Sequence, residues 1–191
     1  MDSLEKIKEE VISCKKCKLH KGRHTPVAGA GNPKARIMLV GEAPGANEDR
    51  QGIPFCGAAG RILDELLVSA GLAREDVYIT NILKCRPPNN RDPESEEIKS
   101  CTPYLDRQIE VVKPQVLCCL GNFAARYIMS KYGFAEEVAG ITKIHGKVFS
   151  YHSIFGSLKI IPFYHPAAAT YNVNLKSTLI KDFKVLKEVL F

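Results

Sequence analysis

Residues 36–45 read RIMLVGEAPG, an apolar run followed by a turn that holds two glycines and a proline. A short apolar run bounded by a turn is typical of a strand that is buried on both faces of a sheet. The turn is tight enough for its backbone to approach a ligand closely. It carries neither the Gly-Lys-Ser/Thr ending of a phosphate-binding P-loop nor the Rossmann glycine pattern, so neither of those motifs is present.

Strands and helices alternate around this stretch. The residue patterns predict further strands at 77–80, 116–120, 147–151 and 158–161, and helices over 1–12, 57–70, through 124–128, from about 95 and from 175 onward. Pro103 must kink the helix that begins near Ser95 or open a second one. Residues 84–93, with three prolines and two asparagines, are expected to form an exposed loop. Such alternation predicts an α/β fold in three layers, α/β/α, with a central, mostly parallel sheet.

The composition is ordinary for a globular protein, with 191 residues, 45% hydrophobic and 25% charged. This length suits one substantial domain, and we expect residues 1–191 to form a single domain. There is no run of about 18 apolar residues and no apolar segment near the N-terminus. We therefore expect an intracellular protein without a membrane span, and we expect a monomer. The net charge of +6 permits a polyanionic partner without requiring one.

Seven cysteines are many for an intracellular chain, which makes metal binding the first explanation to test. Cys14 and Cys17 form a Cys-x2-Cys pair, and Cys85 and Cys101 lie in or beside the proline-rich loop. Four thiolates can hold zinc or an iron–sulfur cluster, although zinc ribbons favour two close pairs. Lysines and arginines flank the four cysteines and would stabilise an anionic centre: Lys15, Lys16, Lys18, Lys84 and Arg86. The other three, Cys56, Cys118 and Cys119, are expected to be buried small hydrophobic residues.

Residues that could take part in binding or catalysis follow three of the predicted strands, after Val40, Thr80 and Ile161. Ligands of parallel sheets bind beyond the carboxyl ends of the strands, so we expect these segments to meet. The first segment is an acidic loop with Glu42, Glu48 and Asp49, the second begins at Asn81, and the third contains His165. An Asn amide presents both a donor and an acceptor, which suits the edge of a pyrimidine. Phe55 precedes a predicted helix and is either a core residue or a stacking platform for a planar ligand.

Together these segments resemble the uracil-DNA glycosylase superfamily, and most of all its family 4, the thermostable iron–sulfur type of bacteria and archaea. The motifs that carry the resemblance run along nearly the whole chain. They are Cys14-x2-Cys17, Gly41-Glu-Ala-Pro-Gly45 with Glu48-Asp49, Pro54-Phe55-x-Gly57, Thr80-Asn81-x3-Cys85-Arg86-Pro-Pro, Asn90-Arg91, Cys101 and His165-Pro166-Ala-Ala.

The resemblance implies one 4Fe–4S cluster, held by Cys14, Cys17, Cys85 and Cys101. It also implies a cytoplasmic DNA repair enzyme that hydrolyses the N-glycosidic bond of deoxyuridine in single- or double-stranded DNA. The products are free uracil and an abasic site, and the target nucleotide is flipped out of the stack.

The resemblance also assigns roles to the residues at the strand ends. Phe55 stacks on the uracil face and Asn81 bonds N3–H and O4. His165 bonds O2 and stabilises the negative charge on the departing base. The backbone from Gly41 through Glu42 to Ala43 contacts the edge of the base. Either Glu42 or Glu48 positions the attacking water or stabilises the cationic sugar, and Glu42 is favoured because the glycine turn holds it.

The chain departs from its relatives at two places. Family 1 has an Asp where this chain has Ala43, so no carboxylate transfers to that position. Family 4 commonly has a leucine after His-Pro-Ala-Ala, where this chain continues to Thr170 and Tyr171. Both are candidate DNA contacts, and the wedge in the base stack is expected to be Tyr171 or a residue further on.

Candidate phosphate contacts are the basic and amide residues Arg86, Asn90, Arg91, Lys15, Lys16 and Lys176, and we expect the basic surface to lie beside the cysteines. Three alternatives remain open at this point. They are a superfamily relative with broader deaminated-base specificity, a non-catalytic iron–sulfur DNA-binding module, and a zinc-stabilised domain of unrelated activity.

Overall fold

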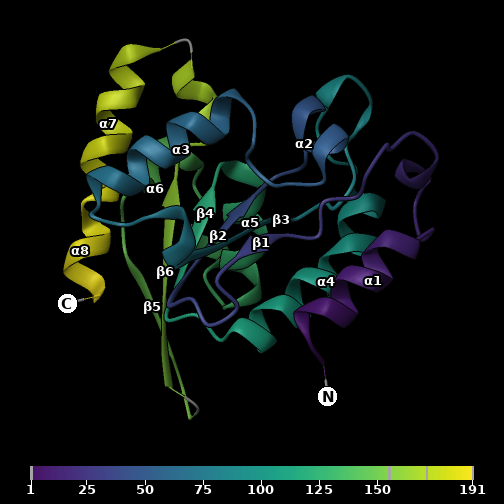
Figure 1. Ribbon diagram of the computed structural model, residues 1–191. Coiled ribbons are helices and arrows are strands. Elements are labelled where there is room, and N and C mark those ends of the chain that lie inside the picture. Colours follow the sequence, from purple (N-terminus) through teal and green to yellow (C-terminus); the bar gives the residue numbers. More distant parts are fainter. Residues whose placement is uncertain (1, 155, 171, 191) are drawn as a thin grey trace.

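The computed structural model describes residues 2–154, 156–170 and 172–190, which fold around one six-stranded sheet (Figure 1). The strands are β1 (Ala30–Gly31), β2 (Ile37–Gly41), β3 (Val77–Asn81), β4 (Val116–Leu120), β5 (Phe149–Ser153) and β6 (Gly156–Phe163). Their order in the sheet is β1-β3-β2-β4-β6-β5. The four central strands are parallel, and the edge strands β1 and β5 are antiparallel to their neighbours. The sheet is therefore mostly parallel, as predicted.

Helices cover both faces of the sheet. They are α1 (Leu4–Ser13), α2 (Ala46–Gln51), α3 (Ala58–Ser69), α4 (Ser95–Val112), α5 (Asn122–Lys131), α6 (Ile141–Ile144), α7 (Val173–Phe183) and α8 (Val185–Leu190). Figure 1 shows α3, α7 and α8 on one side and α1 and α4 on the other. Short 3-10 turns lie between them: η1 (Lys18–Lys21), η2 (Arg74–Asp76), η3 (Pro88–Asn90), η4 (Ala135–Glu137) and η5 (Pro166–Thr170). This is the expected α/β/α arrangement.

Two hydrophobic cores lie on opposite faces of the sheet, because successive strand residues point in opposite directions. In β2, Met38 and Val40 pack with α1, α4 and α5, whereas Ile37 and Leu39 pack with α3, α7 and α8. Every residue of β2 is buried, which explains why its sequence is an unbroken apolar run. None of the helices in the described ranges is long and apolar enough to cross a membrane.

The isolated cysteines differ from one another in burial. Cys118 and Cys119 are fully buried neighbours on β4 and face opposite cores, as expected for small hydrophobic residues. The same expectation is wrong for Cys56, which is partly exposed. It lies between Phe55, which is buried in a core, and Gly57, the N-cap of α3, and its own side chain is not part of that core.

Several predicted element boundaries need correction. Pro103 lies on the exposed side of α4, which continues through it as one helix because its other face is buried against the core. The expected closing helix is divided at Lys184 into α7 and α8. The loop 84–93 is exposed mainly over residues 88–92, since Lys84, Cys85, Pro87 and Pro93 are buried.

The sheet register brings the predicted site segments to one edge. Gly41, the last residue of β2, lies opposite Asn81, the last residue of β3. Pairing continues past the strands, because the N–H groups of Ile82 and Leu83 donate to the carbonyls of Gly41 and Glu42, each at 3.0 Å. On the other side of β4, strand β6 ends at Phe163, two residues before His165. All three segments therefore leave the sheet at its carboxyl edge.

Candidate active site

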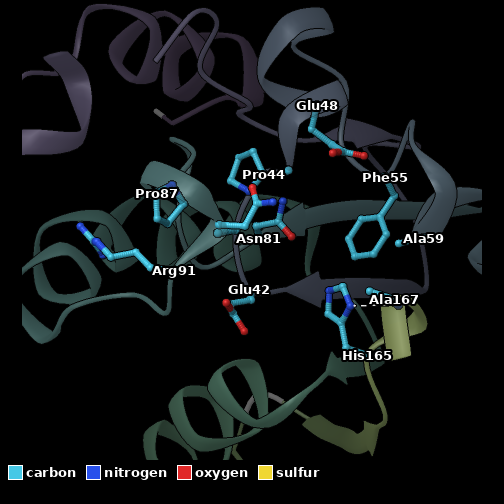
Figure 2. Close-up of a pocket in the computed structure, with 13 residues that line it drawn as sticks. Glu42, Pro44, Glu48, Phe55, Ala59, Asn81, Pro87, Arg91, His165 and Ala167 are labelled. Atoms are coloured by element: carbon cyan, nitrogen blue, oxygen red, sulfur yellow. Dashed lines mark hydrogen bonds between the residues drawn. The ribbon is translucent and has the colours of Figure 1, made fainter. Parts of the chain in front are cut away.

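A pocket of about 330 Å³ opens at this edge (Figure 2). Its volume lies at the lower end of the range for small-molecule sites, which suits a single base better than a large cofactor. The predicted residues that line it are Glu42, Ala43, Glu48, Phe55, Asn81, Asn90, Arg91 and His165. The turn after β2, the end of β3 and the segment after β6 thus contribute to one pocket.

Asn81 lies at the floor of the pocket and is almost completely buried, with 1% of its surface exposed. Among the described residues, its side-chain oxygen Oδ1 is the one buried side-chain polar atom without a hydrogen-bond partner. Leaving such an acceptor unsatisfied costs about 1–3 kcal/mol. The pocket therefore presents an amide that is prepared to receive a donor from a ligand.

Gly41 gives the Asn81 amide its space. A Cβ atom at this position would collide with Asn81 Oδ1 and come within 2.8 Å of the Phe55 ring. A side chain at residue 41 would thus displace the two groups that form the floor and one wall of the pocket.

We expect Gly41→Ala to lower kcat/KM for the substrate at least tenfold, mainly by raising KM. The added methyl group has to be accommodated by moving Asn81 or Phe55. Steady-state kinetics check this, with Gly22→Ala as the matched control because a Cβ there meets no atom within 4 Å. Unchanged kinetics for Gly41→Ala would show that the pocket floor is not in contact with substrate.

Phe55 forms the aromatic wall. Its ring stacks on His165 with 5.5 Å between centroids and an interplanar angle of 27°. Its backbone has a φ of 50°, which costs a non-glycine residue about 1–3 kcal/mol. Gly60 supports this conformation, because a Cβ there would collide with the Phe55 carbonyl oxygen. The strained backbone places the ring beside the pocket, as a stacking platform requires.

His165 is held by the backbone of its own segment. The N–H of Ala167 donates to His165 Nδ1 at 3.2 Å, which leaves the ring proton on Nε2 (Figure 2). Burial lowers the pKa of His165 to about 4, and the nearby Glu48 carboxylate opposes part of that shift. The imidazole is therefore neutral at physiological pH and offers one N–H donor.

The two glutamates of the pocket have different surroundings, and Figure 2 shows them on opposite sides. Glu48 Oε1 accepts the N–H of Gly57 at 2.9 Å, at the start of α3. No other described residue hydrogen-bonds to the Glu42 carboxylate, and burial, followed by the negative charge of Asp92, raises its pKa above the usual value. Glu48 is thus engaged in structure, whereas Glu42 is available to bind a water molecule.

The activity should fall on the acid side as Glu42 becomes protonated. The raised pKa of Glu42 places this fall above the usual carboxyl range. His165, whose pKa is about 4, adds no step near pH 6.5. A pH profile of kcat/KM for the wild type and Glu42→Gln checks this, and the variant should lack the acid limb. An inflection near pH 6.5 that His165→Ala removes would contradict it.

The four predicted cluster cysteines line a second cavity, enclosed by the end of α1, the loop after β3 and α4. The backbone N–H of Lys84 donates to Cys101 Sγ at 3.2 Å, and Arg23 Nη1 donates to Cys85 Sγ at 3.1 Å. Burial raises the pKa of Cys101 to about 11 and also raises those of Cys17 and Cys85. A positively charged metal centre would oppose this effect of burial and favour the thiolate form of Cys17, Cys85 and Cys101.

This donor set fits an iron–sulfur cluster better than one zinc ion. In the described ranges, no group of three or more Cys, His, Asp or Glu side chains is arranged to hold a single metal ion. A polynuclear cluster binds each thiolate through a different iron, so its ligands stand farther apart than the four sulfurs around one zinc. The two N–H donors also suit sulfur atoms that carry negative charge.

Comparison with known proteins agrees with this arrangement. A sequence model of the uracil DNA glycosylase superfamily matches residues 28–187, most of the chain. The chain belongs to the uracil-DNA glycosylase superfamily. It is 54% identical to the type-4 uracil-DNA glycosylase of Sulfurisphaera tokodaii over 190 residues, which cover 99% of this chain and 86% of that protein. The type-4 enzyme of Archaeoglobus fulgidus is 50% identical over 99% of this chain and 94% of its own length.

Similarity to another branch of the superfamily is lower and shorter. The type-5 uracil-DNA glycosylase of Thermus thermophilus is 34% identical over 127 residues, which cover 59% of this chain and 58% of that protein. The resemblance to the type-4 branch, by contrast, spans both the pocket and the cysteine cavity. The family relationship expected from the motifs is therefore confirmed.

A basic hollow adjoins the pocket of this superfamily member. Its cationic side chains belong to Lys18, Lys21, Arg86 and Arg91, and Arg91 also lines the pocket. The Arg91 guanidinium is engaged by Glu97, with bonds of 2.6 and 2.9 Å, whereas Arg86 donates to Asn90 Oδ1 at 2.8 Å. We call this group the basic hollow; it lies between the pocket and η1, which directly follows Cys17.

Other candidate DNA contacts lie elsewhere. Lys84 is fully buried, so it cannot reach a phosphate. Lys16 covers the Tyr104 ring at 4.7 Å, and Lys176 pairs with Glu65 on the other face of the sheet. Thr170 ends η5 and is not among the pocket residues. Tyr171 lies outside the described residues.

Sequence patterns missed three contributions to these sites. Ala167 supplies the N–H that sets the His165 tautomer, a backbone role that no side-chain type reveals. Arg23 donates to Cys85 and to the carbonyl of Ile12, although nothing in its local sequence marks it. Pro44 and Pro87 shape the pocket walls. Pro44 belongs to the turn at residues 41–45, so its place beside the site could have been predicted from the sequence.

Proposed function

We propose that this protein is a type-4 uracil-DNA glycosylase that hydrolyses the N-glycosidic bond of deoxyuridine in DNA. It releases free uracil and leaves an abasic site. The observation that carries the proposal is the buried Asn81 amide, whose unsatisfied acceptor faces a base-sized pocket. The two type-4 relatives, which are 54% and 50% identical over nearly the whole chain, support it.

The protein recognises uracil by hydrogen bonds to the edge of the base and by stacking on its face. The Asn81 carbonyl accepts N3–H, the Asn81 amino group donates to O4, and Phe55 covers the ring. Gly41, Glu42 and Ala43 present backbone to the edge of the base. Cytosine reverses both polar groups, and a buried site built on hydrogen bonds rejects such a mismatch strongly. Flipping the nucleotide costs a few kcal/mol, which these contacts offset.

Bond cleavage moves charge from the sugar to the base. The electron pair of the C1′–N1 bond leaves with uracil, and the negative charge spreads to O2, where His165 Nε2–H donates a hydrogen bond. The sugar becomes a cation, which the Glu42 carboxylate stabilises. A water molecule held by Glu42 forms the new bond to C1′ and transfers its proton to that carboxylate. Glu48 supports the site by capping α3 at Gly57.

The cysteine cavity is proposed to hold one 4Fe–4S cluster, with Cys14, Cys17, Cys85 and Cys101 as ligands. When bound, the cluster supplies four covalent links that tie α1 to the loop after β3 and to α4. Its role is structural, and the glycosidic cleavage described above does not use it. This cross-link would fix the loop that leads from Asn81 to the basic hollow.

DNA in single- or double-stranded form is the proposed partner, and we propose that the protein binds it as a monomer. One domain, residues 1–191, carries both sites. The substrate implies action in the cytoplasm of a bacterial or archaeal cell. Arg86, Asn90 and Arg91 are proposed to contact the DNA strand. Thr170 and Tyr171 are proposed to contact the DNA where the flipped nucleotide has left the base stack.

Affinity for DNA should fall with salt because the basic hollow neutralises phosphates. On single strands the slope of log K against log salt is about −0.7 per phosphate contact, so Arg86→Ala should make the slope shallower by about 0.7. Fluorescence anisotropy with a labelled strand measures this. Lys187→Ala is the control, because Lys187 is exposed on α8, far from the hollow. A salt-independent affinity would exclude the hollow as the DNA contact.

A panel of oligonucleotides tests the function against its alternatives. Each carries one uracil, hypoxanthine, xanthine, thymine or cytosine, and base release is measured without added metal. The proposal predicts release of uracil alone. Release of several deaminated bases would instead identify a relative with broader specificity, and binding without release of any base would identify a non-catalytic module.

A further inference from the structure

Lys84 is among the largest fully buried side chains in the described part of the protein. Its ammonium group donates to three oxygens: Thr80 Oγ1 at 2.6 Å, the Asn81 carbonyl at 2.7 Å and Gln108 Oε1 at 2.7 Å. None of these acceptors is a carboxylate. A buried charge without an ion-pair partner is costly, commonly by several kcal/mol, so its retention calls for a specific role.

The acceptors are themselves fixed by further hydrogen bonds. The carbonyl of Ala28 accepts from Thr80 Oγ1 at 2.9 Å and from Gln108 Nε2 at 2.7 Å. Gln108 lies on α4 and Thr80 on β3, so the network joins a helix, a strand and the segment that leads to β1. The ammonium group is therefore held rigidly with all three of its protons in use.

Asn81 is positioned from its backbone and not from its side chain. Its Oδ1 atom has no partner among the described residues, so no protein donor fixes that side of the amide. The backbone carbonyl, in contrast, is the acceptor for Lys84 Nζ. The Asn81 backbone is thus held on one side by its pairing with Gly41 in the sheet and at its carbonyl by Lys84, three residues later in the chain.

The other end of Lys84 reaches the cysteine cavity. Its backbone N–H donates to Cys101 Sγ at 3.2 Å, and Cys85 is its neighbour in sequence. One residue therefore contacts both the base-reading residue and a cluster ligand. The two sites are joined by a single buried side chain and its own backbone.

We propose that Lys84 is a positioning residue for uracil recognition, which holds the Asn81 amide at the pocket floor and ties that position to the cysteine-bearing loop. This inference rests on the proposed function, since it takes uracil as the base that Asn81 reads. It assigns to Lys84 no contact with substrate. A purely structural lysine would instead affect stability and leave base recognition unchanged.

A double-mutant cycle separates these two roles. Lys84→Met keeps the apolar length and removes the ammonium group, and it is measured in the wild type and in the Asn81→Ala background. We expect a roughly 10–100-fold fall in kcat/KM in the wild type, the size expected for losing a hydrogen bond to a charged group. In the Asn81→Ala background the expected change is less than about twofold. An equal fall in both backgrounds would overturn the proposal.

Two further measurements keep the outcome clear. Iron content should be unchanged in Lys84→Met. Loss of iron would indicate that Lys84 supports the cysteine site instead of Asn81, and it would overturn the proposal. Ile128→Ala on α5, a buried residue outside both sites, is the control for stability, and its kcat/KM should stay at the wild-type value. Thr80→Val removes one acceptor with little change in shape, so it should show a smaller loss of the same kind if Lys84→Met does not fold.

A binding assay distinguishes failure of this inference from failure of the proposed function. Strands with one 2′-deoxypseudouridine, a C-nucleoside that cannot be cleaved at a C–N bond, are compared with strands carrying a tetrahydrofuran abasic analogue. Lys84→Met should reduce the preference for the base at least about tenfold while affinity for the abasic strand stays the same. An unchanged preference would overturn the role of Lys84 even where the wild type cleaves uracil normally.

Discussion

Replacing His165 with Ala should lower kcat for uracil release by roughly 10²–10³-fold. The variant loses the Nε2–H donor that faces the base, and removing one such donor to a developing oxyanion costs about this much. The effect should fall on kcat more than on KM, because the charge on O2 exists only as the bond breaks. Single-turnover kinetics with a uracil-containing strand measure it.

The control for His165 is His152→Ala, on the exposed face of β5 and remote from the pocket. Its rate should equal that of the wild type. His165→Ala should also bind abasic-analogue DNA as well as the wild type does. A rise in KM with kcat unchanged, or a rate within threefold of the wild type, would mean that His165 does not stabilise the departing base.

Loss of a cluster ligand should have the second large effect, on stability. Cys101→Ser and Cys85→Ser are each expected to lose the iron and the brown colour, because a serine hydroxyl does not replace a thiolate on iron. The proposed cluster would join segments that are distant in sequence, and one such cross-link contributes about 2–4 kcal/mol by analogy with disulfides. In a chain of this size, 1 kcal/mol corresponds to about 2–4 °C, so Tm should fall by about 4–16 °C.

Two other cysteines provide matched controls for these variants. Cys118→Ala removes a fully buried core thiol and Cys56→Ser changes a partly exposed one. Both should keep the full iron content, measured by metal analysis and visible absorption. Zinc in place of iron in the wild type, or full iron in Cys101→Ser, would contradict the ligand assignment.

The sequence predicted the carboxyl edge of the sheet well, because apolar runs identify buried parallel strands. The ends of such strands share one edge, so Gly41, Asn81 and His165 could be placed together before any geometry was known. The grouping of Cys14 and Cys17 with Cys85 and Cys101 came from the family resemblance, since spacing alone left zinc open.

Other features depend on contacts that no local pattern encodes. The sequence places Lys84 in a loop expected to be exposed, yet its burial is made possible by Thr80, Gln108 and the Asn81 carbonyl. Pro103 was expected to kink the helix or open a second one, and no second helix begins there because α4 runs through Pro103 with its other face buried. In both cases tertiary packing outweighs the local preference of the residue.

The structure distinguishes Glu42 from Glu48 as the carboxylate that could hold a water molecule, whereas the sequence only favoured Glu42. Both follow the same glycine turn, and only geometry shows that Glu48 Oε1 is bound by Gly57 while the Glu42 carboxylate has no partner among the described residues. The absence of an acidic residue at Ala43 then leaves Glu42 as the carboxylate proposed to hold the water.

The central claim is that the pocket at the ends of β2, β3 and β6 removes uracil from DNA. Its most direct test is mass-spectrometric analysis of the free base released from a strand with one deoxyuridine, under single-turnover conditions. The wild type should release one uracil per strand, and Asn81→Ala with the same iron content should release it at least 10²-fold more slowly. No free base from the iron-loaded wild type, or equal release by the variant, would contradict the claim.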